Sequence, residues 1–431
     1  MTQNGLTVGI NEKPKSIGSW IILSLQHVFA MFGATVLVPM LTGLDVGVAL
    51  VASGIGTLIY ILCTKGKVPV YLGSSFAYIT TISAAIVATG SASAAYLGLM
   101  VVGIIYVLIA LIIFFVGSGW LKKLLPPVVI GPMIIIIGLT LAPVAVLNFG
   151  LLGMQPLYDN GLYIGLAGAD WKVPLVAFIT FATVVILTTK AKGFLKIVPF
   201  IIAILVGYIF SVIFGVVNLG ETFSNVSFFQ VPNFSIIGTY DFNFSQVLVF
   251  APLAFVTIAE HIGDHVVLGE ITGNDFIENP GLHRTLLGDG IATFVSASLG
   301  GPANTTYGEN TGVIALTKVG SVFVIGLAAI FAILLGFLGY IQAFIMSIPW
   351  AVIGGMTIIL YGLIAANGVK VLIKDKTDLS KMKNLIIVST MLVIGLGGAF
   401  INVTDSTTLQ GMSLAAIVGI ILNQILTALE K

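Results

Sequence analysis

Residues 93–117 read SAAYLGLMVVGIIYVLIALIIFFVG, a run without a single charged side chain. A helix needs about 20 apolar residues to cross the hydrocarbon core of a bilayer. The rest of the chain is similar: of 431 residues, 58% are apolar and 8% are charged, against roughly 25% charged in soluble domains. So few polar side chains cannot cover a soluble surface. The composition predicts an all-α membrane protein with many spans and excludes soluble classes and intrinsic disorder.

Charge and cysteine content narrow the possibilities further. The net charge of +1 gives no basic surface for nucleic acid, so no nucleic-acid partner is expected. The single cysteine, Cys63, lies in an apolar run and can form neither a disulfide framework nor a cysteine-based metal site. Glycine is frequent, with 50 residues, which in membrane helices indicates close packing and local breaks.

Fourteen apolar segments can be read along the chain. They lie near 17–40, 46–64, 70–89, 93–117, 127–148, 173–189, 195–218, 246–270, 284–299, 305–318, 321–339, 341–366, 384–401 and 409–429. With a cytoplasmic N-terminus, fourteen crossings put every Lys and Arg except Lys172 on the cytoplasmic side. Because cations gather in cytoplasmic loops, this distribution favours fourteen spans with both termini in the cytoplasm.

Two of these segments share an unusual beginning. The third contains SSFAY at 74–78 and the tenth contains TTYGE at 305–309. Fourteen spans suggest two halves of seven, and an odd number of spans inverts the second half relative to the first. The leads of both segments are poor helix starts, so we expect short extended segments followed by half-helices at mid-membrane, where a cavity or other protein groups satisfy the backbone. Chance similarity in an apolar alphabet is the alternative.

Three carboxyl groups, those of Glu260, Asp264 and Glu309, lie inside predicted spans, and that of Asp289 is a further candidate. An ionisable group in hydrocarbon costs about 2.5–3.5 kcal/mol, so such groups usually face an interior cavity and serve function. Glu260 and Asp264 are four residues apart and share one helical face. With no cation inside any span to balance them, we expect these carboxyl groups to share, bind and release protons.

His261 and His265 form a second pair with the same spacing, rotated about 100° from the first pair on the helix. We take His265, with Glu260 and Asp264, as a candidate for proton coupling. A hydrogen-bonded packing role between helices is the alternative for both histidines.

A metal site is the rival interpretation of this stretch. His261-x-x-Asp264-His265 resembles a zinc-binding helix, but no HExxH motif and no third ligand are found, since the remaining histidines are His27 and His283. Gly288-Asp289-Gly290 has no partner motif of an intramembrane aspartyl protease. We therefore expect a protein that is not an enzyme and has no metal and no cofactor.

The polar run 304–312, NTTYGENTG, supplies the second half of a ligand site opposite the carboxylates of 260 and 264. Carboxylates accept hydrogen bonds from N–H groups, and free backbone N–H groups donate hydrogen bonds to carbonyls. Because no Lys or Arg lies within a predicted span, the site has no fixed cation that would attract an organic anion. A neutral planar molecule with alternating N–H and C=O edges fits, and nucleobases match that description. Aromatic candidates to pack on its face are Phe76, Tyr307 and Tyr361.

The chain resembles the nucleobase–ascorbate transporter family over nearly its whole length. The motifs are QHVFAMFGATVLVP at 26–39, YLGSSFA at 71–77, AEH at 259–261, PGLHR at 280–284 and NTTYGEN at 304–310. The family signature, an acidic or amide residue followed by Asn-x-Gly, four residues, Thr and a basic residue, matches 309–318.

The resemblance implies an inverted repeat of seven plus seven spans in the cell membrane. A core domain would comprise residues 1–117 and 246–339, and a gate domain residues 118–245 and 340–431. It further implies import of uracil by proton symport through alternating access, and a homodimer formed through the gate domain.

The resemblance also implies roles for single residues. Glu260 and Glu309 would bind the N–H groups of the base, and the backbone N–H groups of Phe76 and Gly308 would hold its carbonyls. Tyr307 would assist, and Tyr361 would lie on the gate side.

Other transport functions stay open. Some relatives carry His where Asp264 stands, so the coupling group is less firmly implied than the ligand groups. Glu309 favours uracil over xanthine, whose carriers more often have Gln there. A purine symporter, a Na⁺-coupled carrier and a passive channel are the alternatives.

Overall fold

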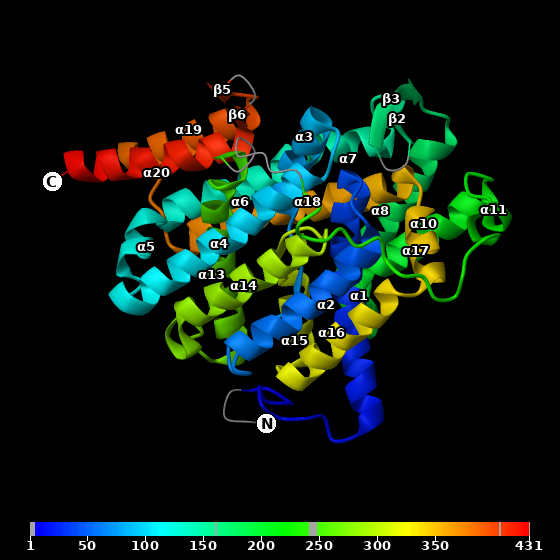
Figure 1. Ribbon diagram of the computed structural model, residues 1–431, viewed down its shortest axis with the longest axis horizontal. Helices are drawn as coiled ribbons and strands as arrows, with labels where there is room; N and C mark the ends of the chain where they lie inside the picture. The colour runs from blue at the N-terminus through cyan, green and yellow to red at the C-terminus, as the bar shows by residue number, and fades with distance from the viewer. Residues whose placement is uncertain (1–4, 160–161, 241–247, 405–406, 431) are drawn as a thin grey trace.

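The computed structural model describes residues 5–159, 162–240, 248–404 and 407–430, and most of these are helical (Figure 1). The longer helices are α1 (Ile17–Thr42), α2 (Val46–Cys63), α3 (Ile79–Thr89), α4 (Ser93–Val116), α6 (Pro127–Thr140), α8 (Lys172–Lys190), α10 (Pro199–Ile213), α13 (Leu253–Thr272), α14 (Leu282–Ser298), α15 (Gly308–Thr317), α16 (Val322–Gly336), α18 (Trp350–Lys374), α19 (Met382–Leu396) and α20 (Gly411–Leu429). Shorter helices are η1 (Phe76–Tyr78), α5 (Gly119–Leu124), α7 (Ala142–Phe149), α9 (Phe194–Ile197), α11 (Leu219–Phe223), η2 (Ile277–Gly281) and α17 (Gly339–Met346).

Among the residues that the structure describes, six short strands form three separate antiparallel pairs. They are β1 (Leu72–Ser74) with β4 (Asn304–Thr306), β2 (Met154–Asp159) with β3 (Leu162–Gly168), and β5 (Phe400–Thr404) with β6 (Thr407–Gln410). The first pair joins segments from the two halves of the chain, whereas the other two pairs are local hairpins. The long-range pair is therefore the feature that brings the two polar leads together.

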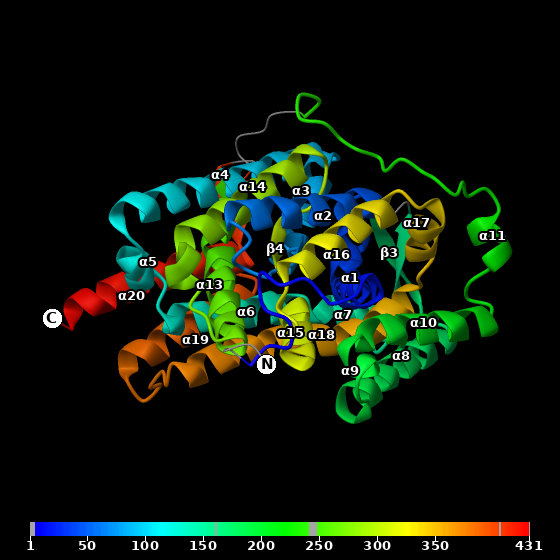
Figure 2. The same ribbon diagram turned by 90° about the horizontal axis from the view of Figure 1, so that it is seen from below.

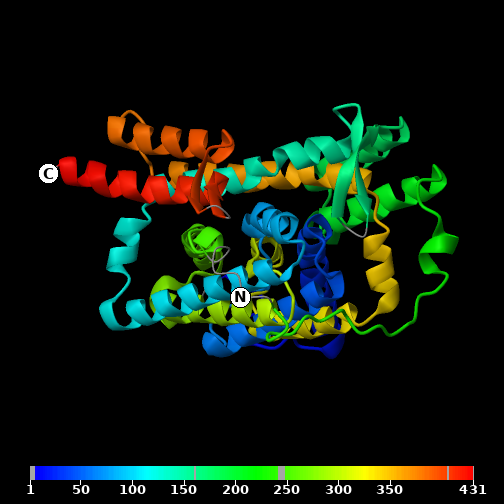
Figure 3. The same cartoon turned by 45° about the horizontal axis from the view of Figure 1, so that its top comes forward.

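The helices form two layers. In one, α14 packs against α2 and α4, and α2 packs against α16; in the other, α18 packs against α6, α7 and α8, and α19 packs against α6 and α20. Figure 2 shows the layers edge-on, with α13, β4 and α15 between them, and Figure 3 shows the same separation from a third direction. The segments that carry the intramembrane carboxylates thus lie at the boundary between the layers.

Glycines allow the closest helix contacts within the first layer. A Cβ added to Gly54 on α2 would lie 2.6 Å from Cγ1 of Ile333, and one added to Gly336 on α16 would lie 2.7 Å from the carbonyl oxygen of Gly47. Larger side chains would force α2 and α16 apart, which is the role of small residues in membrane helix packing. The close packing predicted from the glycine content is confirmed for this pair.

The segment before α1 is bound to the end of α15. The N–H of Thr7 donates to the carbonyl oxygen of Lys318 at 2.7 Å, Val8 forms a parallel bridge with Val319, and Leu6 is buried. These contacts hold the end of α15 in place at the edge of the first layer.

The predicted spans coincide with helices, or with a strand and its following helix, throughout the described residues. Seven described helices are long and apolar enough to cross a membrane, and four shorter apolar helices accompany them. The helices within 246–270, 284–299 and 305–318 belong to neither set because they are more polar or shorter; residues 246 and 247 lie outside the described residues. The structure is thus that of a polytopic helical protein, while the count of fourteen spans stays a prediction.

Two features differ from the sequence-based expectation. The predicted continuous segment 341–366 is divided into α17 and α18, with Ser347 as the C-cap of α17 and Pro349 as the N-cap of α18. The residue before a proline is disfavoured in helical conformation, so the helix ends there. The β2–β3 and β5–β6 hairpins lie where the sequence predicts loops or span ends, because segments such as MQPLYD and LYIGLAG do not alternate strictly between apolar and polar residues.

Candidate functional site

The pairing of β1 with β4 places two half-helices next to each other. Leu72 pairs with Thr306 and Ser74 with Asn304, and η1 and α15 begin within two residues of the paired strands. Both strands are buried. The predicted extended segments and half-helices are therefore present, and the first N–H groups of each helix have no intrahelical acceptor.

The carboxylates of α13 face the β1–β4 strand pair. Glu260 and Asp264 are half-buried and lie on one face of α13, which packs against β4 and α15. The hydroxyl of Thr306 in β4 donates a 2.5 Å hydrogen bond to Oδ2 of Asp264. Asp264 is thus bonded to the long-range strand pair, while the carboxylate of Glu260, one turn earlier, forms no side-chain hydrogen bond or ion pair with the described residues.

Glu309 is the carboxylate of the other half-helix. It occupies the first turn of α15 and is half-buried, and α15 packs against α13, which carries Glu260. Asp264 follows Glu260 by one turn on α13, and Asp289 lies on α14. In the described part of the chain, no Lys or Arg forms an ion pair with any of these carboxylates. The structure therefore brings together acidic groups from both halves without a neutralising cation.

The remaining predicted ligand residues lie around the β1–β4 strand pair and the helices that follow it. Tyr307 is buried, and its hydroxyl donates to the carbonyl of Ser74 at 3.0 Å and accepts from Thr35 at 3.3 Å. Gly308 is exposed, and a Cβ added to it would meet nothing within 4 Å. The ring of Phe76 contacts that of Tyr361 edge-on, with centroids 6.3 Å apart. Tyr361 belongs to α18, so this ring pair crosses the boundary between the two layers.

The histidines of α13 face away from the carboxylates of 260 and 264. His261 is paired through Nδ1 with Oδ2 of Asp289 on α14 at 2.9 Å. His265 is bonded through Nε2 to the hydroxyl of Tyr60 on α2, and through Nδ1 to the carbonyl of His261 at 2.7 Å. All four side chains are buried. They fasten α13 to the first layer, and the coupling role of His265 stays a prediction.

One contact was not assigned a role from the sequence. The amide of Asn310 donates to Nδ1 of His27 at 3.1 Å and to the backbone carbonyl of His27 at 3.0 Å. Both residues are buried, and the contact joins α15 to α1 directly beside Glu309. Both lie in the motifs quoted above, but no spacing rule links positions so far apart in the chain.

No group of three or more His, Cys, Asp or Glu side chains suited to a metal ion occurs within the described ranges. The residues of the zinc-helix alternative have separate partners: Asp289 for His261, Tyr60 for His265 and Thr306 for Asp264. The donor set does not fit a metallopeptidase centre.

Comparison with known proteins identifies the family of the chain. Residues 18–404 match the model of the Permease family. The chain is 48% identical to the uracil permease of Bacillus subtilis strain 168, over 99% of this chain and 96% of that protein. It is 47% identical to the uracil permease of Bacillus caldolyticus, over 98% and 95%.

The fold is similar to that of a solved membrane transporter. The transmembrane domain of the cyanobacterial bicarbonate transporter BicA aligns with a TM-score of 0.63 at 16% identity, covering 95% of this chain and 97% of that one. The similarity supports a helical multi-pass membrane fold. The chain therefore belongs to the Permease family, a family of transporters rather than enzymes, as its motifs predicted.

Proposed function

We propose that this chain imports uracil across the cell membrane together with a proton. The observation that carries the proposal is the packing of α13, with Glu260, against α15, with Glu309, beside two half-helix starts, without a cation paired to either carboxylate in the described residues. Such a site suits a neutral ligand that offers N–H donors and carbonyl acceptors. The names of the two Bacillus relatives, both uracil permeases, support uracil as that ligand.

The binding mode follows from the chemistry of the groups. Carboxylates of Glu260 and Glu309 accept the two N–H groups of the base, and the free N–H groups of Phe76 and Gly308 donate to its two carbonyls. Tyr307, held by Ser74 and Thr35, fixes the start of α15 so that Glu309 points toward the base. The rings of Phe76 and Tyr361 form an apolar wall against its face.

Proton coupling follows from the cost of moving charge. Two or three carboxylates without a counter-ion are costly to carry through hydrocarbon. Uptake of a proton by the Glu260–Asp264 pair reduces that charge before the site changes sides, and the proton is released on the inner side. Asp264 accepts from Thr306, so its protonation would also change its contact with the long-range strand pair.

The two layers support an alternating-access architecture. We assign the first layer, together with α13, β4 and α15 at its boundary, to a core domain (1–117 and 246–339), and the second layer to a gate domain (118–245 and 340–431). Fourteen spans in an inverted repeat, with cytoplasmic termini, complete the proposal. A homodimer through the gate domain stays a prediction.

Uptake of labelled uracil into proteoliposomes tests the function. With an imposed inward proton gradient, uracil should accumulate above its external concentration, and an uncoupler should abolish the accumulation. Strong competition by xanthine or guanine would point instead to a purine symporter. Equilibration without accumulation would indicate a passive channel. Accumulation that depends on a Na⁺ gradient would show that Na⁺, and not the proton, is the coupling ion.

Replacing Glu309 with Gln should weaken uracil binding about tenfold to a hundredfold. The amide keeps the size of the side chain but loses a charge-assisted hydrogen bond, worth about 1.5–3 kcal/mol, and 1.4 kcal/mol is a tenfold change in affinity. Calorimetry on the purified protein measures the dissociation constant. Glu221→Gln, at an exposed position on α11, is the control, and an unaltered constant for Glu309→Gln would contradict the assignment.

A further inference from the structure

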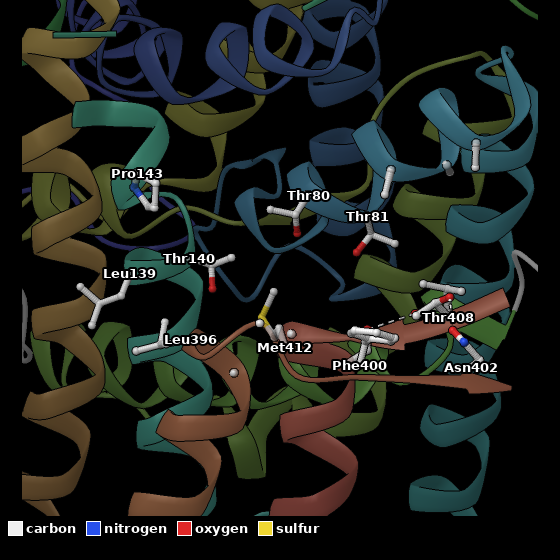
Figure 4. Close-up of a pocket in the computed structure, with 18 residues that line it drawn as sticks. Thr80, Thr81, Leu139, Thr140, Pro143, Leu396, Phe400, Asn402, Thr408 and Met412 are labelled. Atoms are coloured by element: carbon white, nitrogen blue, oxygen red, sulfur yellow. Dashed lines mark hydrogen bonds between the residues drawn. The ribbon is translucent and has the colours of Figure 1, made fainter. Parts of the chain in front are cut away.

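A cavity of about 800 Å³ lies between the two layers, away from the carboxylates of α13 and α15. Thr80 and Thr81 of α3 line one side, and Thr140 of α6, Phe400 of β5 and Met412 of α20 line the other. Figure 4 shows the threonine side chains of α3 pointing across the cavity toward Phe400 and Met412. The layers are therefore separated at this end of their boundary.

The position of the cavity relates it to the proposed site. Thr80 follows Phe76 by one helical turn, so the cavity begins directly beyond the Phe76–Tyr361 ring pair. Under the proposed orientation, α3 runs toward the outer face and α20 starts there. The cavity then lies on the outer side of the bound base.

At the opposite end of the boundary, an ion pair joins the layers. Lys374 in the last turn of α18 pairs with Glu270 in the last turn of α13. Of the ion pairs among the described residues, this one crosses between the layers, whereas His261–Asp289 lies within the first and Lys383–Glu430 within the second. The layers thus touch through opposite charges on the side away from the cavity.

Glu270 does not stabilise the helix that carries it, α13. A helix carries partial negative charge at its C-terminus, so a carboxylate in the last turn is unfavourable there, whereas a cation such as Lys374 is favourable. The favourable partner of the Glu270 carboxylate is Lys374 of the second layer. The contact between the layers therefore offsets the unfavourable position of this carboxylate at the end of α13.

We propose that Glu270 and Lys374 form an inner latch between the core and gate domains, closed while the outer cavity is open and broken when the site opens inward. The proposal rests on the proposed transport function and orientation. The two side chains are 60% and 46% exposed, so water screens them and the pair is weak. A weak pair is suited to a transition that must reverse in every cycle, because it shifts the ratio of the two states by up to about fivefold without trapping either.

Site-directed thiol labelling tests the latch. Cys63 is the single cysteine, so Cys63→Ala with Thr81→Cys leaves one thiol, in the wall of the cavity. In right-side-out vesicles, its reaction rate with a membrane-impermeant maleimide reports the outward-open population. Adding Lys374→Ala or Glu270→Ala should lower the rate by up to about fivefold, and the exchanged pair Glu270→Lys with Lys374→Glu should restore it.

The matched control is Lys383→Ala, which breaks an ion pair inside the second layer and should leave the rate unchanged. Unchanged rates in both single variants, or no recovery in the exchanged pair, would overturn the latch. Labelling of Thr81→Cys from the inner side alone would also overturn it, because the cavity would then face inward. Labelling needs no uracil, so a failure of the substrate assignment in uptake assays is distinguished from a failure of the latch.

Discussion

A variant with Glu260 replaced by Gln should accumulate no uracil when an inward proton gradient is imposed on proteoliposomes. Gln has almost the same size as Glu, so the packing of α13 is kept. The amide cannot bind and release a proton, and it cannot supply the charge whose neutralisation couples proton entry to movement of the site. Glu260 forms no ion pair in the described residues, and its helix packs against α15, which carries Glu309. Its replacement therefore removes the group on which the proposed coupling depends.

The control for this variant is Glu278→Gln, an exposed position after the same helix, which should accumulate uracil normally. Circular dichroism and size-exclusion chromatography would show that both variants are folded. Undiminished accumulation by Glu260→Gln under the same gradient would contradict its role in coupling.

Replacing Gly73 with Ala should abolish uracil binding and lower the melting temperature. The added Cβ would lie 2.3 Å from Cε2, 2.4 Å from Cζ and 2.7 Å from Oη of Tyr307. That ring cannot move aside easily, because it is buried and its hydroxyl is bonded to Ser74 and Thr35. Overpacking of a filled site costs about 1–3 kcal/mol or more. The strain would separate β1 from β4 and displace the half-helix that carries Glu309.

Gly18→Ala is the matched control for this substitution. A Cβ added there meets nothing within 4 Å, and Gly18 lies in the first turn of α1, where Ala is the better helix former. Binding calorimetry and thermal unfolding of the two variants make the comparison. Normal binding by Gly73→Ala would show that the strand pair does not position the site.

Much of the site could be predicted because intramembrane carboxylates are costly and therefore informative. The spacing of Glu260 and Asp264 placed them on one face of a helix. The similar sequences at 74–78 and 305–309 predicted two half-helices, and the strands that precede these helices, β1 and β4, pair with each other. The same physical rule explains both successes: polar side chains and irregular backbone persist in a membrane only where protein surrounds them.

Other features have no local signal in the sequence. His261 and His265 repeat the spacing of the carboxylates, and the pattern alone does not tell which pair faces β4. Contacts of the histidines with Asp289 and Tyr60 show that the histidines face the first layer. The Glu270–Lys374 pair joins the ends of two helices that are distant in the chain. The break between α17 and α18, by contrast, does have a local signal: Pro349 interrupts a run whose hydropathy is continuous.

Cross-linking measures directly whether the two acidic positions face one hollow. In the Cys63→Ala background, the pair Glu260→Cys with Glu309→Cys is treated with a short bifunctional thiol reagent, and linked peptides are identified by mass spectrometry. The control pair, Glu270→Cys with Glu309→Cys, moves one thiol about 15 Å along α13. The account predicts a link in the first pair and none in the second. Failure of the first pair to link, although a monofunctional reagent modifies both of its cysteines, would contradict it.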